Sequence, residues 1–148
     1  MLLKSTMRAS RTALQHRRCQ QLLQKNFSTL ILAEHFEGQL GSSVGSCLTA
    51  ASELNDPHVD VLVHGSEDSV KKQVDELKKY PGLTKIYTAT HDDLENAYGN
   101  TIAKIATNLV NENSYTNVIS ASSGFGKDVV PRLGGLLDLQ PITDVVQI

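Results

Sequence analysis

The sequence predicts an α/β domain in which a mostly parallel sheet is covered by helices on both faces. Three observations lead to this prediction. From residue 28 onward, short apolar runs alternate with longer amphipathic stretches. Pro, Gly, Asn and Asp residues separate the two kinds of segment. Strands that alternate with helices in this way are typical of a parallel sheet, and the crossovers between its strands are expected to be right-handed.

The first part of this domain is predicted to contain three strands and two helices. The expected strands cover residues 29–33, 59–64 and 84–88. The first helix is expected at residues 41–54. The second is expected to start at Gly65 and Ser66 and to end at Pro81, with acids in its first turn and lysines in its last, where the helix dipole favours them. Apolar residues at helical spacing mark the inward faces: Val44, Leu48, Ala51 and Leu54 in the first helix, and Val70, Val74 and Leu77 in the second.

The second part is predicted to begin with a longer helix, capped by Asp92 or Asp93 and running to about residue 110. Its apolar stripe consists of residues three or four apart: Leu94, Tyr98, Ile102, Ile105 and Leu109. The remaining elements are a strand at residues 117–120, a helix at 126–138, and a strand that begins at residue 144 and reaches Ile148.

Charge divides the chain into a basic N-terminal segment and an acidic body. Residues 1–33 contain six basic residues and no acid, whereas the rest of the chain contains all 16 acids and 8 bases. Residues 1–28 are rich in Arg, Ser, Thr and Gln, with apolar residues scattered at roughly helical spacing. This composition is typical of a mitochondrial transit peptide, and a disordered basic tail is the alternative. Cleavage is expected near Phe27 and Ser28.

Several classes of protein and site are disfavoured by the composition. An acidic body is a poor match for nucleic acid, whose phosphates require a positive surface. No run of about 18 apolar residues is present, so the chain is not expected to be a membrane protein. Cys47 is expected to be a buried thiol. Four histidines in the body lack the spacing of metal ligands, and each is interpreted as a strand-end or cap residue: His35, His58, His64 and His91.

The segment most suggestive of a binding site is residues 122–127, with the sequence SSGFGK. It follows an expected strand and opens an expected helix, so its backbone N–H groups could hold a phosphate, with Lys127 adding charge. The match to a P-loop is poor, because Ala121 stands where a glycine is needed and Asp128 follows the lysine in place of Ser or Thr. A tight structural turn is therefore the favoured interpretation.

Pro131 and Arg132 lie inside the same expected helix. Proline is tolerated in a helix near its first turn, where no N–H donor is needed. Arg132 is expected to pair with an acid or to face a partner. No nucleophile and base are brought together by sequence spacing, and no G-x-S-x-G segment occurs, so a small hydrolase is disfavoured.

Three segments resemble the alpha subunits of electron transfer flavoproteins. Residues 29–35 (TLILAEH) resemble the opening strand of that family, and residues 121–133 (ASSGFGKDVVPRL) resemble its glycine-lysine-x-x-x-proline-arginine block. Residues 137–146 (LDLQPITDVV) resemble the segment that follows. The order and spacing agree, and the second block is the most specific. Gly134 and Gly135 depart from the family pattern of Ala or another small residue, and each weakens a helix by about 1 kcal/mol relative to Ala.

The resemblance implies a three-layer Rossmann-like domain with a mostly parallel sheet, of the adenine-nucleotide alpha-hydrolase-like kind. It also implies an electron carrier of the mitochondrial matrix that is a heterodimer with a beta subunit. Such carriers accept electrons from acyl-CoA dehydrogenases and related enzymes. They pass them to electron transfer flavoprotein-ubiquinone oxidoreductase, in fatty acid and amino acid oxidation. The chain is thus expected to be a carrier subunit without catalytic residues of its own.

The resemblance places FAD in a C-terminal domain that would begin soon after Ile148, so residues 29–148 are expected to be a C-terminally truncated N-terminal domain that binds no cofactor alone. This domain is expected to serve as scaffold and beta-subunit interface. The alternative is a free-standing adenine-nucleotide-binding domain of the universal-stress type. Six residues are interpreted as loop or partner-interface residues: Gly124, Phe125, Gly126, Lys127, Pro131 and Arg132.

Overall fold

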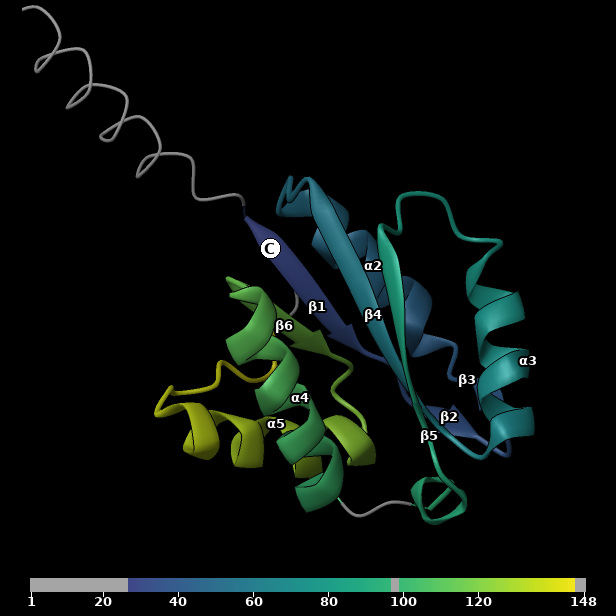
Figure 1. Ribbon diagram of the computed structural model, residues 1–148. Coiled ribbons are helices and arrows are strands. Elements are labelled where there is room, and N and C mark those ends of the chain that lie inside the picture. The colour runs from purple at the N-terminus through teal and green to yellow at the C-terminus, as the bar shows by residue number, and fades with distance from the viewer. Residues whose placement is uncertain (1–26, 97–98, 146–148) are drawn as a thin grey trace, which may run out of the picture.

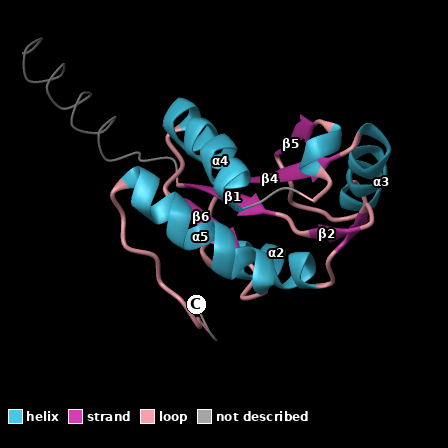
Figure 2. Ribbon diagram, turned by 90° about the horizontal axis from the view of Figure 1, so that it is seen from below, coloured by secondary structure: helices cyan, strands magenta, loops and turns pink. Residues whose placement is uncertain are grey.

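The computed structural model describes residues 27–96 and 99–145. Within these residues, a four-stranded parallel sheet carries helices on both faces, as Figures 1 and 2 show. This arrangement confirms the predicted α/β, Rossmann-like fold class. The expected transit peptide lies outside the described residues except at its last two positions. Among the helices that the structure describes, none is long and apolar enough to cross a membrane.

The sheet has the order β5-β4-β1-β6, and all of its neighbouring strands are parallel. The central strand is β1 (Ser28–Leu32), between β4 (His58–Gly65) and β6 (Asn117–Ser120). The strand β5 (Lys85–Thr90) lies outside β4. The middle strands are buried at almost every position, which is why they appear in the sequence as continuous apolar runs. Four of the five predicted strands are confirmed to within two residues.

Two helices cover each face of the sheet. One face packs against α2 (Ser43–Glu53) and α3 (Glu67–Leu77), and the other against α4 (Gly99–Asn113) and α5 (Gly124–Leu137). The first core includes strand residues with odd numbers and the second includes those with even numbers, as the pleat of β1 and β4 requires. The strand residues at the centre of the first core are Ile31, Val61 and Val63, and those at the centre of the second are Leu30, Leu32 and Leu62.

The helix α2 buries Val44, Cys47 and Ala51, so its inward face is close to the predicted one. Leu48 is partly buried, and Leu54 is the C-cap residue. Cys47 is a buried thiol, as expected, and burial raises its pKa. In α3, the side chain of Ser66 caps the N-terminus and the first turn carries two acids, as predicted. The prediction of lysines in the last turn of α3 is wrong, because the helix ends at Leu77 and Lys78 is its C-cap.

A small hairpin after β1 has no counterpart in the prediction. It consists of β2 (His35–Phe36) and β3 (Gln39–Leu40), which pair antiparallel. The connecting residues Glu37 and Gly38 have φ angles of 49° and 77°, which is the geometry of a type I′ turn. Strands of two residues are too short to produce a periodic pattern in a sequence.

The prediction of one long helix capped by Asp92 or Asp93 is wrong. A short 3₁₀ helix, η1 (Asp92–Leu94), comes first, and α4 begins only at Gly99. The separation has a physical reason: Glu95 turns toward α3 and accepts hydrogen bonds there, which interrupts the helix. The cap of η1 is His91, whose Nδ1 accepts a bond of 3.2 Å from the N–H of Asp93. Tyr98, expected in the apolar stripe, lies outside the described residues.

The C-terminal elements differ from the prediction in smaller ways. The helix α5 begins at Gly124, two residues before its expected start. The predicted strand at residues 144–148 is wrong at its beginning: Asp144 has a φ of 56° and lies in a bend. Residues 146–148, the rest of that strand, lie outside the described residues.

Candidate functional site

The carboxyl edge of the sheet is the first place to search for a site. The chain runs outward from β1 to β4 and β5 and then crosses to the other side of β1 to form β6. In open α/β sheets, ligands bind where the strand order reverses, outside the carboxyl ends of the strands. The junction between β6 and α5, which contains the predicted loop 122–127, lies at this position (Figure 1).

The β6–α5 junction is a tight turn. Ser123 caps α5, because its Oγ accepts a bond of 3.3 Å from the N–H of Gly126. The backbone of Gly126 lies so close to that of Ala121 that a Cβ on Gly126 would be 1.9 Å from the Ala121 carbonyl oxygen. The N–H of Lys127 donates to the carbonyl of Ser123 at 2.9 Å. The Lys127 bond is the first regular bond of the helix, whereas the N–H of Gly126 is a first-turn donor that a phosphate would need and that is bonded within the turn. This supports the structural interpretation.

Asp128, the residue that breaks the P-loop pattern, joins the two helices on its face of the sheet. Its Oδ2 accepts a bond of 2.9 Å from the N–H of Gly99, at the first residue of α4. Its Oδ1 accepts from Nε and Nη2 of Arg132, each at 2.9 Å. Arg132 thus pairs with an acid, which is one of the two roles expected for it. The pair is about half exposed, so its own contribution to stability is small, below about 1 kcal/mol.

Pro131 lies inside α5, as expected, but beyond the first turn in which a proline is best tolerated. A proline here cannot donate to the carbonyl of Lys127 four residues earlier. The side chain of Pro131 is exposed, and water can therefore take the place of the missing donor. The role of these residues and of Gly124 and Phe125 as partner contacts stays a prediction.

Two histidines that the sequence left as separate strand-end residues meet at this edge. His35 begins β2 and His64 lies near the end of β4, and their ring centroids are 4.7 Å apart in an edge-to-face arrangement. On its other side, His64 stacks on Phe125 of α5, with centroids 5.3 Å apart and planes inclined by 13°. His64 is only 5% exposed. No sequence signal connects residues so far apart, so only the fold reveals this cluster.

The electrostatics of the cluster keep both imidazoles neutral near pH 7. Burial, followed by repulsion from His35, lowers the pKa of His64 to about 4. Burial also lowers the pKa of His35, and the nearby Glu95 opposes both shifts. Glu95 accepts from Ser69 Oγ at 2.6 Å and from the N–H of Ser66 at 2.8 Å, and these bonds hold its pKa at about 2. No group of three side chains suited to a metal ion occurs in the described part of the chain.

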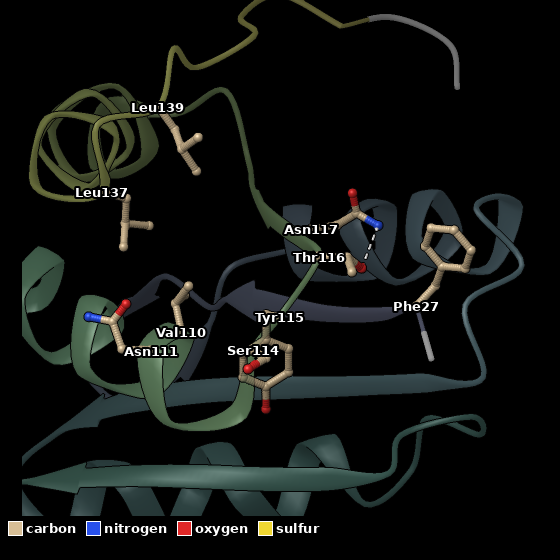
Figure 3. A pocket seen from close by; sticks show the side chains of 9 residues that line it. All are labelled: Phe27, Val110, Asn111, Ser114, Tyr115, Thr116, Asn117, Leu137 and Leu139. Carbon is tan, nitrogen blue, oxygen red and sulfur yellow. Dashed lines mark hydrogen bonds between the residues drawn. The ribbon is translucent and has the colours of Figure 1, made fainter. Parts of the chain in front are cut away.

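An open groove lies at the opposite, amino end of the sheet (Figure 3). It has a volume of about 870 Å³ and lies between the end of α4, the start of β6 and the segment after α5. Tyr115 reaches from this wall into the sheet, where its O–H donates to the buried carboxylate of Asp60. The lining is partly polar and partly apolar: Phe27, Val110, Asn111, Ser114, Tyr115, Thr116, Asn117, Leu137 and Leu139.

Comparison with known proteins identifies the family. The model of the electron transfer flavoprotein domain matches residues 29–148. The chain belongs to the electron transfer flavoprotein domain family. This result confirms the resemblance that residues 29–35, 121–133 and 137–146 indicated.

The curated relatives of this electron transfer flavoprotein domain are alpha subunits. The electron transfer flavoprotein subunit alpha, mitochondrial, of Arabidopsis thaliana is 33% identical over 128 residues, which are 85% of this chain and 35% of the relative. A probable subunit of the same name from Cryptococcus neoformans var. neoformans is 31% identical over 147 residues, 99% of this chain and 41% of the relative. The Dictyostelium discoideum subunit is 31% identical over 131 residues, which are 84% of this chain and 36% of the relative. The chain therefore spans well under half the length of these relatives.

Proposed function

We propose that residues 29–148 are the N-terminal scaffold domain of the alpha subunit of a mitochondrial electron carrier. The domain contacts the beta subunit and catalyses no reaction itself. In the complete subunit, electrons pass from acyl-CoA and related dehydrogenases to a quinone oxidoreductase, in fatty acid and amino acid oxidation. The names of the relatives support this role and the mitochondrion as its location. Residues 1–28 serve as the transit peptide, and the destination is the matrix.

The observation that carries the scaffold role is a set of exposed apolar residues before β1, near the end of α5 and in the segment that follows it. We name them the amino-end surface, and they are large residues that are about half exposed or more: Phe27, Leu136, Leu139, Ile142 and Val145. Phe27 and Leu139 also line the groove. Leu139 is 65% exposed and Ile142 is 85% exposed. Several large apolar side chains exposed together are typical of a protein–protein interface. The groove lined by Phe27 and Leu139 supplies a concave surface that a partner's side chains can fill.

FAD supplies the redox chemistry in the complete subunit, but the carboxyl edge of this domain does not fit it. A flavin dinucleotide needs free N–H groups for its pyrophosphate at a helix N-terminus. At α5, the N–H of Gly126 is bonded to Ser123 and the Ala121 carbonyl lies against the glycine. The carboxylate of Asp128 adds negative charge next to this turn. The same geometry argues against the adenine-nucleotide-binding alternative. Titration calorimetry of the chain with AMP and ATP tests that alternative, and micromolar binding would support it.

The scaffold role is tested by coexpressing the chain with the electron transfer flavoprotein beta subunit of the same organism. Binding is then measured by sedimentation for the unchanged chain and for Leu139→Asp and Ile142→Asp variants. Each substitution puts a charge into the amino-end surface, so we expect at least about tenfold weaker binding, the size of a moderate interface contact.

The matched control is Phe36→Asp. Phe36 is 76% exposed, but it belongs to the hairpin that follows β1, at the other end of the sheet from Phe27 (Figure 1). We expect this variant to bind as the unchanged chain does. Equal losses in all three variants would contradict the proposed location of the interface. Failure of the unchanged chain to bind the beta subunit would contradict the scaffold role itself.

A further inference from the structure

The His35–His64 pair connects three elements that are distant in the sequence. His35 belongs to the β2–β3 hairpin, His64 to the end of β4, and Phe125 to the first turn of α5. The contacts among them are ring against ring, 4.7 Å and 5.3 Å between centroids. Both ring nitrogens of His35 and Nδ1 of His64 are buried without a hydrogen-bond partner among the described residues. Such a contact is stable only while both imidazoles are neutral.

We propose that this pair is a proton-operated latch, in which protonation releases the hairpin and the first turn of α5 from the end of β4 while the sheet stays folded. The inference goes beyond the scaffold role, since it concerns the carboxyl edge and not the amino-end surface. A proton on His64 places a charged N–H where no acceptor is available. A second proton on His35 places two positive rings 4.7 Å apart, which repel strongly when buried.

The groups around the pair decide the sign of this effect. The segment after η1 contributes Glu95, whose negative charge favours protonated histidines. From α3 come two uncharged groups: Ser69, which donates to Glu95, and Gln73, which donates to the carbonyl of His64 at 2.9 Å. From α5 comes the uncharged ring of Phe125. Burial of both rings, together with the repulsion of His64 by His35, outweighs the acid, because the pKa of both histidines is lowered.

Of the two elements that the latch holds, the hairpin is the more weakly attached to the rest of the domain. The hairpin consists of two strands of two residues. Its base is tied by a bond of 3.0 Å from the N–H of Gly41 to the carbonyl of Glu34, and its turn packs Gly38 against Ser69. By contrast, β1 and β4 are paired from Ser28 to Leu32 and covered on both faces. Local opening of the edge therefore costs less free energy than unfolding of the sheet.

The test is amide hydrogen exchange of the whole chain between pH 7.5 and 4.5, expressed as protection relative to the intrinsic rate at each pH. Below pH 6.5, we expect protection of residues 35–40 and 124–127 to fall about tenfold per pH unit if one proton is taken up, and up to about a hundredfold if both are. Protection in β1 and β4, which are exposed only by global unfolding, should stay higher than protection at the edge at every pH. Equal protection at the edge and in these strands, or no change at the edge, would overturn the proposal.

Two variants check that these histidines are responsible. His64→Phe keeps a ring of similar shape against Phe125 but removes the titrating group. The fall in protection at the edge should therefore be about tenfold smaller for each pH unit than in the unchanged chain. His91→Gln is the control, because this exposed histidine caps η1 and is not in the cluster. An unchanged pH dependence in the His64 variant, or its loss in the His91 variant, would contradict the latch. Should His64→Phe fail to fold, the exchange data of the unchanged chain decide the question alone.

Discussion

The replacement of Gly126 by alanine tests whether the β6–α5 junction is a closed structural turn. The added Cβ would lie 1.9 Å from the Ala121 carbonyl oxygen, whereas real Cβ contacts are essentially never shorter than 3.0 Å. The first turn of α5 would have to move by about 1 Å, because the obstacle is backbone and cannot rotate away. Such overpacking costs about 1–3 kcal/mol, and the better helix propensity of alanine returns at most about 1 kcal/mol. We therefore expect Gly126→Ala to lower the free energy of unfolding by about 1–2 kcal/mol in total.

The matched control is Gly124→Ala, two residues earlier in the same turn. A Cβ on Gly124 would meet no atom within 4 Å, so its effect should stay within about 0.5 kcal/mol. Urea denaturation followed by circular dichroism measures both variants, and an altered midpoint with an unchanged slope reports stability alone. If Gly126→Ala proves as stable as Gly124→Ala, the junction is more open than the structure indicates. The argument against an anion site there would then fail.

Further predictions follow from the same contacts. Gly135→Ala should raise the free energy of unfolding by up to about 1 kcal/mol, since the added Cβ meets no atom within 4 Å. Gly134→Ala should lower the free energy of unfolding, because the added Cβ would lie 2.7 Å from a carbonyl oxygen. Urea midpoints in the opposite order would contradict this. Asp128→Ala should lower the free energy of unfolding by about 1–2 kcal/mol, because the cap of α4 is lost, whereas Arg132→Ala should lower it by less than about 1 kcal/mol. Equal losses for the two variants in urea denaturation would assign the effect to the ion pair. The folded-state pKa of His64, about 4, lies below its unfolded value of 6.5, so the folded state binds fewer protons and stability is lost as the pH falls through this window. Thermal denaturation should show that the free energy of unfolding falls between pH 7 and 5, and the loss should approach about 3 kcal/mol at still lower pH. An equal dependence of this free energy on pH in a His64→Phe variant would contradict the assignment to His64.

The parts of the fold that could be predicted from the sequence depend on burial and local capping. Strands β1 and β4 are buried on both faces, so every position must be apolar or nearly so, and a continuous run results. The start of α3 is marked by Ser66, whose side chain bonds the N–H of Ser69 within the same short segment. In both cases the residues that determine the structure lie next to each other in the chain. The family resemblance added the functional class, which composition and spacing alone did not reveal.

The parts that could not be predicted depend on contacts between distant residues. Whether a helix begins at Asp92 or at Gly99 is decided by Glu95, which bonds α3, and by Asp128, which caps α4 from another helix. Local propensity at residues 92–99 carries no trace of either partner. The meeting of His35 with His64 likewise depends on the pairing of β1 with β4 and on a hairpin too short to produce a pattern.

The two ends of the sheet support the proposal that this domain serves a carrier without holding its cofactor. At the carboxyl edge, where α/β folds usually bind ligands, Ser123 takes up a helix N–H group, the backbone of Ala121 closes on Gly126, and Asp128 caps α4. The first contact uses a donor that a phosphate would need, the second closes the turn, and the third places a carboxylate next to it. At the amino end, apolar side chains stay exposed around a groove. A fold that closes its usual ligand site and leaves an apolar surface uncovered is suited to bind another protein.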